Sequence, residues 1–183
     1  VNFFFGGAMD VLQPYIDAGK LVVPSGQMTK DEVATANWAT DAAQARFENI
    51  LSSNYADGTP LHAVLASNDS TALGVTNALA ANYTNDVYPV ITGQDCDIAN
   101  VPNIVNGKQA MSVFKDTRTL ATKVVEMVDA IMTGGEAPVN DTKTYDNGTG
   151  IIPSYLCEPV AVTADNYKEI LIDSGYYTED QIQ

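Results

Sequence analysis

Residues 62–75 read His-Ala-Val-Leu-Ala-Ser-Asn-Asp-Ser-Thr-Ala-Leu-Gly-Val, and this stretch decides the fold class of the chain. Ala63–Ala66 is a short, continuous apolar run, which is typical of a strand buried on both faces. Asn68 and Asp69 follow, and a helical pattern begins directly after them; Asn or Asp at that place predicts a helix N-cap. The stretch therefore predicts a strand that carries a polar loop to its carboxyl end, where open α/β sheets bind ligands.

The same alternation of apolar strands and amphipathic helices runs along the whole chain. Strands are expected at residues 21–23, 63–66, 89–92 and 110–114, with an extended segment at 151–163. Helices are expected near residues 2–18, after Trp38, from 69 to about 85, and at 98–106, 117–133 and 165–173, with loops at 24–37 and 136–150. Strands that alternate with helices predict an α/β fold, with a parallel sheet flanked by helices and right-handed crossovers.

Composition excludes several classes of partner. The chain has 183 residues, nine basic against 23 acidic, and a formal net charge of −14. Such a surface repels phosphate backbones and anionic lipid, so no nucleic-acid partner is expected. Its hydrophobic content of 45% is enough to form a core. The sequence has no run of eighteen apolar residues, so no membrane-spanning helix is expected.

Polar residues follow three successive predicted strands. They are Asn68 with Asp69, Gln94 with Asp95, and Lys115. Carboxyl ends of parallel strands meet at one edge of a sheet, so these loops bring together an amide, a carboxylate and an ammonium. That mixture suits a polyhydroxyl ligand such as a sugar, and the sole tryptophan, Trp38, can add a flat face for a sugar ring.

Each of these residues also has a purely structural interpretation. Asn68 can serve only as a helix cap, Asp95 can serve only in a turn, Lys115 can be solvated, and Trp38 can belong to the core. Enzyme signatures are weak: His62, the only histidine, precedes a strand, and no nucleophile, phosphate-loop or dinucleotide motif is present. We expect no enzyme activity, no cofactor and no metal, and keep an α/β enzyme that uses Asp95 and Lys115 as a rival hypothesis.

The two cysteines, Cys96 and Cys157, fit neither a zinc cluster nor a Cys-x-x-Cys redox pair. Either a disulfide or two separate thiols is compatible with their spacing, and two thiols are the favoured interpretation.

Several motifs in consistent order resemble the sugar-binding proteins of bacterial ABC importers, in the branch of the xylose-binding and multiple-sugar receptors. They are Gly7–Ile16, Ser67–Asp69, Ile91–Asp95, Ser112–Arg118 and Val139–Thr142. The resemblance runs over nearly the whole chain and implies a type I periplasmic-binding-protein fold, in which two Rossmann-like lobes close on a monosaccharide. Cys96 departs from the small residue that close relatives carry.

The resemblance also implies a role for each candidate residue. Trp38, Asn68, Asp95 and Lys115 match sugar-contacting positions, and Asp69 and Gln94 match positions that support the loops. A monosaccharide of the xylose, glucose, galactose or arabinose class is the implied ligand. An ABC importer permease is the implied partner, with a chemoreceptor or a sensor kinase as further candidates. The implied location is extracytoplasmic, either in a periplasm or as a surface lipoprotein of a Gram-positive cell.

By the same resemblance the sequence is similar to a C-terminal piece of such a receptor. Residues 1–115 are expected to form most of the second lobe, 116–153 the returning part of the first, and 154–183 a crossover strand and terminal helix on the second lobe. The expected sheet order 2-1-3-4-5 would then lack its central strand. We expect either a neighbouring molecule in that gap or the strand near Val160–Thr163 at a sheet edge, with the apolar stripe of helix 117–133 exposed. The sensor domain of a LacI-type regulator shares the fold. The alternative function is therefore sugar sensing as the effector domain of such a transcription regulator.

Overall fold

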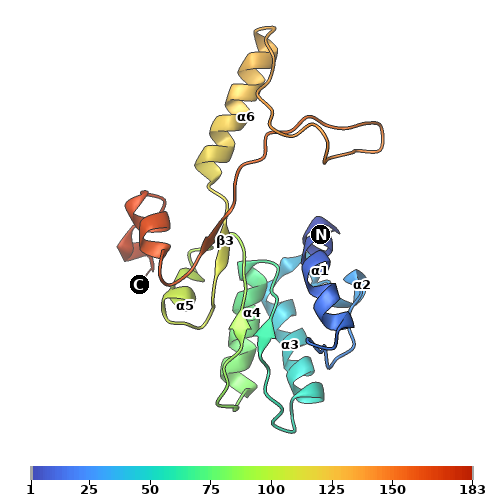
Figure 1. Cartoon of the computed structure of the whole chain (residues 1–183). Helices are drawn as coiled ribbons and strands as arrows, with labels where there is room; N and C mark the ends of the chain where they lie inside the picture. The colour runs from blue at the N-terminus through green and yellow to red at the C-terminus, as the bar shows by residue number, and fades with distance from the viewer. Residues whose placement is uncertain (1, 183) are drawn as a thin grey trace. The chain divides into compact units, whose positions relative to one another are not determined.

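The computed structural model describes residues 2–182, and Figure 1 shows the elements in chain order. They are α1 (Asn2–Asp17), α2 (Lys30–Val33), η1 (Ala36–Trp38), α3 (Thr40–Asn54), β1 (Ala63–Val64), α4 (Asp69–Asn82), β2 (Val90–Ile91), α5 (Val101–Val105), β3 (Ser112–Phe114), α6 (Thr117–Met132), β4 (Val160–Val162), η2 (Lys168–Asp173) and η3 (Glu179–Ile182). Every helix that the periodicity predicts is present, the last one as the π-helical segment η2.

The chain forms two compact units, which are described separately. The first contains the residues up to 112 and those from 162 onward, and the second contains residues 113–161. Strands β3 and β4 pair with each other, and the division between the units runs through both. The predicted assignment of residues 1–115, 116–153 and 154–183 to lobes stays a prediction.

The core of the first unit lies between helices α3 and α4 and the parallel strands β1 and β2. Ala63 pairs with Val90 and Val64 with Ile91. Helices α3 and α4 lie side by side (Figure 1). They approach closely at Gly74, where a Cβ atom would collide with the backbone oxygen of Thr40. Small residues at this crossing therefore let the two helices share one apolar core with β2.

The strand expected at residues 21–23 is absent, and this prediction is wrong. Leu21, Val22 and Val23 form a turn and an irregular segment, and Val22 is 78% exposed. A strand needs a hydrogen-bonding neighbour, and β1 pairs with β2 alone. Strong β propensity in a three-residue run therefore does not suffice for a strand.

The sheet order 2-1-3-4-5 is also absent from the described residues. Strand β1 pairs with β2, and β3 pairs with β4, as two separate two-stranded sheets. Strand β4 (Val160–Val162) comes from the tail and takes an edge beside β3, which confirms the second of the two expected arrangements.

The segment 24–37, expected to be a loop, contains the short helices α2 and η1. Thr29 and Glu32 form a capping box: the Glu32 amide donates to Thr29 Oγ1 at 3.4 Å, and the Thr29 amide donates to Glu32 Oε2 at 2.9 Å. This Thr-x-x-Glu spacing is a helix-start signal, but no apolar face follows it, so the hydrophobic pattern alone predicts a loop here.

The second unit consists of α6 and an extended return segment. Asp116 caps α6 by accepting from the Arg118 amide at 2.9 Å. No α6 side chain is buried, and Val124 and Ile131 are about 60% exposed, which confirms the expected exposure of the apolar stripe. Antiparallel bridges pair the two arms of the return segment, and Lys123 lies 4.9 Å from the ring of Tyr155. Within residues 2–182, no helix has the length and apolar character to cross a bilayer.

Candidate functional site

The loops that follow β1 and β2 are joined directly at the carboxyl ends of these strands. The amide of Asp69 donates to the carbonyl oxygen of Gln94 at 2.8 Å. Nearer the strands, the Thr92 hydroxyl lies 3.1 Å from both the amide nitrogen and the carbonyl oxygen of Ala66. The structure therefore brings Asn68 and Asp95 to the same edge of the sheet, each one residue from this joint.

Asn68 is the N-cap of α4, as its place in the sequence predicts. Its Oδ1 accepts from the Thr71 amide at 3.1 Å and from the Thr71 hydroxyl at 2.7 Å. The cap thus uses the acceptor end of the amide. Within the described chain the Nδ2 group of this half-buried side chain makes no hydrogen bond.

Asp95 lies in a left-handed turn. Its φ is +97° and that of Cys96 is +52°, a region that residues other than glycine rarely adopt. Hydrogen bonds hold the two following amides: Cys96 N donates to Ser112 Oγ at 3.0 Å, and Asp97 N donates to Asp69 Oδ2 at 2.8 Å. Such conformations cost about 1–3 kcal/mol per residue and persist only when the surroundings over-determine them, so these two hydrogen bonds help to maintain the turn at Asp95.

The carboxylate of Asp69 is fully buried and restrains this turn by hydrogen bonding. Besides the Asp97 amide it accepts from the Ser112 hydroxyl at 2.8 and 2.9 Å and from Gln109 Nε2 at 2.8 Å. Asn100 Nδ2 bridges the Asp69 carbonyl at 2.9 Å and Gln109 Oε1 at 2.8 Å. Burial raises the pKa of Asp69, and the donors from Gln109, Ser112 and Asp97 oppose that shift.

Gln109, Ser112 and Asn100 are part of this network, and sequence reasoning missed them. Ser112 lies inside the predicted strand 110–114, and a polar side chain in a buried strand needs a hydrogen-bonding partner. That signal could have identified Ser112, although its partner Asp69 could not be read from the spacing.

Gly93 leaves the space that the network occupies. A Cβ atom at this position would overlap Asp69 Oδ1 and Gln109 Nε2. The Gly93-Gln94-Asp95 motif therefore needs its glycine for the close approach of these side chains rather than for an unusual backbone angle.

Trp38 ends the short helix η1 and also has a left-handed backbone, with φ of +56° after +55° at Asn37. Its ring packs edge-to-face on Phe4, with centroids 5.9 Å apart and an interplanar angle of 81°. Within residues 2–182 no hydrogen bond joins the Trp38 side chain to either loop of the joined pair. Lys115 follows β3 directly, is half-buried and belongs to the second unit.

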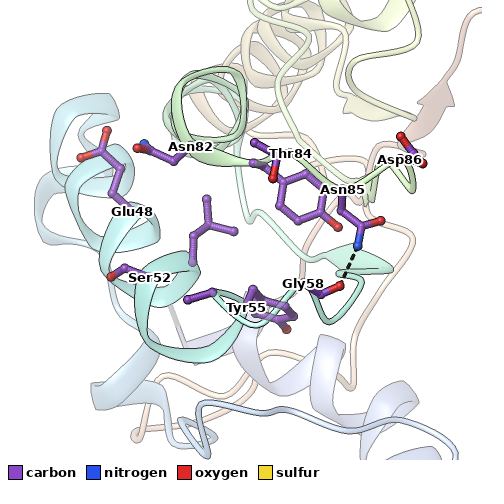
Figure 2. A pocket seen from close by; sticks show the side chains of 11 residues that line it. Glu48, Ser52, Tyr55, Gly58, Asn82, Thr84, Asn85 and Asp86 are labelled. Atoms are coloured by element: carbon purple, nitrogen blue, oxygen red, sulfur yellow. Dashed lines mark hydrogen bonds between the residues drawn. The ribbon is translucent and has the colours of Figure 1, made fainter.

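A cavity of about 510 Å³ lies at the other end of α3 and α4. Figure 2 shows the side chains that line it. Tyr55 and Tyr83, which follow the last residues of these helices, line it together with Glu48 and Asp86. None of the candidate residues lies in its wall, so this cavity is separate from the joined loops. No group of three His, Cys, Asp or Glu side chains suited to a metal ion occurs in the described residues.

Comparisons with known proteins find relatives along nearly the whole chain. Residues 1–136 match the periplasmic binding protein domain. The chain is 50% identical, over 99% of its length, to the multiple sugar-binding periplasmic protein SbpA of Azospirillum brasilense. It is 35% identical, over 99% of its length, to the D-xylose-binding periplasmic protein of Escherichia coli. It spans about half the length of these curated relatives, 51% of each.

A solved structure is more similar still. The crystal structure of an ABC transporter solute binding protein from Clostridium phytofermentans with bound β-D-glucose is 70% identical, with a TM-score of 0.95 over 99% of this chain and 56% of that chain. This match confirms the predicted α/β fold of type I periplasmic binding proteins. These relatives are solute-binding proteins rather than enzymes, which argues against the enzyme hypothesis. Because the domain match covers well over half of its residues, the chain belongs to the periplasmic binding protein family.

Proposed function

We propose that the full-length protein binds a monosaccharide reversibly between two lobes and delivers it to an ABC importer. The observation that carries the proposal is the pair of joined loops, which hold Asn68 and the strained Asp95 at the carboxyl ends of β1 and β2. An amide donor beside a carboxylate suits adjacent sugar hydroxyls, because the amide donates to a hydroxyl oxygen and the carboxylate accepts from two hydroxyl groups.

The ligand class follows from the same groups and from the relatives. β-D-glucose is bound in the solved structure that is 70% identical, and the curated relatives are named for multiple sugars and for D-xylose. We therefore propose a neutral monosaccharide of the glucose, xylose, galactose or arabinose class. Asn68, Asp95 and Lys115 supply the polar contacts, Trp38 supplies a stacking face, and Asp69 and Gln94 support the loops.

Binding favours domain closure in this proposal. A sugar that touches two lobes stabilises the closed arrangement by its extra contacts there, and a permease recognises that closed form. A chemoreceptor or a sensor kinase can use the same closed surface. The relatives are periplasmic, so we propose a location outside the cytoplasm. Where a cell has no outer membrane, a lipid anchor would keep the protein at the surface.

Calorimetry of the full-length protein with D-glucose, D-xylose, D-galactose and L-arabinose tests the proposal. Asp95→Ala should weaken binding by about 2–4 kcal/mol, roughly one to three decades in Kd, because sugar hydroxyls lose a charged acceptor. Asp86→Ala removes an exposed carboxylate at the other end of α4 and should leave Kd unchanged.

Trp38 provides a second readout. If it stacks on the sugar, its fluorescence should change in the wild type, and in Asp95→Ala the same change should need sugar concentrations about one to three decades higher. A silent titration of a protein that binds by calorimetry would place Trp38 outside the site. Equal affinity of the wild type and Asp95→Ala would refute the site itself.

A further inference from the structure

The C-terminal segment reaches the left-handed turn through one hydrogen bond. The hydroxyl of Tyr177, which lies between η2 and η3, donates to the carbonyl oxygen of Cys96 at 3.0 Å. Both residues belong to the first unit, so this contact lies within a single compact body. Tyr177 thus touches the residue next to Asp95 without lying beside it in the sequence.

The peptide group between Cys96 and Asp97 is held at both ends. Its carbonyl accepts from Tyr177, and its N–H donates to the buried carboxylate of Asp69 at 2.8 Å. The preceding N–H, that of Cys96, donates to Ser112 at 3.0 Å. A peptide plane held at its carbonyl and at its N–H cannot rotate freely, so these bonds restrain the backbone of Cys96, the residue that follows Asp95 in the turn.

Tyr177 is itself well placed for such a role. Its amide donates to the carbonyl of Leu171 at 2.8 Å, and its ring meets the ring of Tyr176 edge-to-face at 4.9 Å. Leu171 is fully buried and anchors η2 in the first unit. Burial raises the pKa of Tyr177, so its hydroxyl keeps its proton and remains a donor at neutral pH.

We infer that Tyr177 is a positioning residue for the binding turn: through the Cys96 carbonyl it holds the left-handed conformation that presents Asp95 to the ligand. This inference rests on the proposed function. It makes the C-terminal segment a determinant of sugar affinity, although no residue of that segment was a candidate contact. Asp69 and Ser112 hold the same turn from the other side, so loss of the Tyr177 hydroxyl should loosen the turn without unfolding it.

A competing role for Tyr177 is to anchor the tail alone. The two roles separate in Tyr177→Phe, which keeps the ring and its packing on Tyr176 but removes the donor. Tyr167→Phe is the matched control, because it makes the same change in the same segment at a hydroxyl that has no hydrogen bond within the described residues.

The experiment compares the wild type, Tyr177→Phe and Tyr167→Phe as full-length proteins. Calorimetry with D-glucose should show Kd about three- to tenfold weaker in Tyr177→Phe and unchanged in Tyr167→Phe. Without sugar, the amide of Asp97 should exchange its hydrogen several-fold faster in Tyr177→Phe, while amides in the middle of α4 keep their protection.

The outcomes distinguish this inference from the proposed function. If the wild type binds sugar and Tyr177→Phe binds equally well with unchanged exchange at Asp97, the positioning role is overturned and the proposed function stands. If Tyr177→Phe lowers only the melting temperature, the tail-anchoring role holds instead. A wild type that binds none of the four sugars overturns the proposed function and the inference with it.

Discussion

The hydroxyl of Ser112 lies 2.8 and 2.9 Å from the two carboxylate oxygens of Asp69, and both side chains are fully buried. Ser112 begins β3 and Asp69 begins α4, so this hydrogen bond ties the third strand along the chain to the helix that follows the first. Ser112 Oγ also accepts from the Cys96 amide. One serine hydroxyl therefore connects the buried carboxylate to the turn that carries Asp95.

The buried carboxylate of Asp69 predicts a specific pH dependence of stability. Burial raises the pKa of Asp69 in the folded protein above its value in the unfolded chain. Its contribution to stability is then fully present below the unfolded pKa and is lost as pH rises through the folded pKa. In urea titrations, the free energy of unfolding of the wild type minus that of Asp69→Asn should grow as pH falls from 7 to about 4.

Asp97, whose pKa burial also raises, is present in both proteins, so the part of its titration caused by burial and by Asp95 cancels in this difference, and its interaction with the Asp69 charge does not. A difference that shrinks on acidification would mean that the hydrogen bonds from Gln109 and Ser112 outweigh the cost of burial.

Gly93 predicts a steric effect on stability. Gly93→Ala forces a Cβ atom onto Asp69 Oδ1, which accepts from the Ser112 hydroxyl, and onto Gln109 Nε2, which donates to the Met111 carbonyl. We expect a loss of about 1–3 kcal/mol in the free energy of unfolding, measured by urea denaturation. Gly7→Ala is the control: the position lies inside α1 with open space around it, so alanine should be neutral or slightly stabilising. Equal stability of Gly93→Ala and the wild type would show that the network can shift to admit a methyl group.

The two cysteines should differ in reactivity. Both are free thiols; Cys96 is fully buried and Cys157 is half-buried. Burial raises the pKa of Cys96 to about 12, and only the thiolate is nucleophilic, so Cys96 should resist iodoacetamide in the folded protein at neutral pH. Mass spectrometry should show one adduct on the native protein and two after unfolding.

Cys157→Ser supplies the control for that experiment, and it should leave the native protein unmodified. Rapid alkylation of native Cys157→Ser would show that the turn beside Asp95 opens far more often than its hydrogen bonds imply.

Local patterns predicted most of the helices, because each depends on its own residues. The apolar stripe predicts α6, and the cap at Asn68 predicts the start of α4 within one residue. The segment 21–23 failed for the opposite reason: its β propensity is local, but a strand forms only with a partner that lies elsewhere.

The sequence by itself determined the fold class, the placement of Asn68 and Asp95 after successive strands, and the family to which the chain belongs. Those properties follow from short-range pattern and from motif order. The tertiary structure alone decided how the turn at Asp95 is held, because Asp69, Ser112 and Tyr177 reach it from three distant segments. Hydrogen bonds of that kind form between side chains that are close in space but far apart in the sequence. The spacing of residues along the chain does not show which of them will be close until the fold is known.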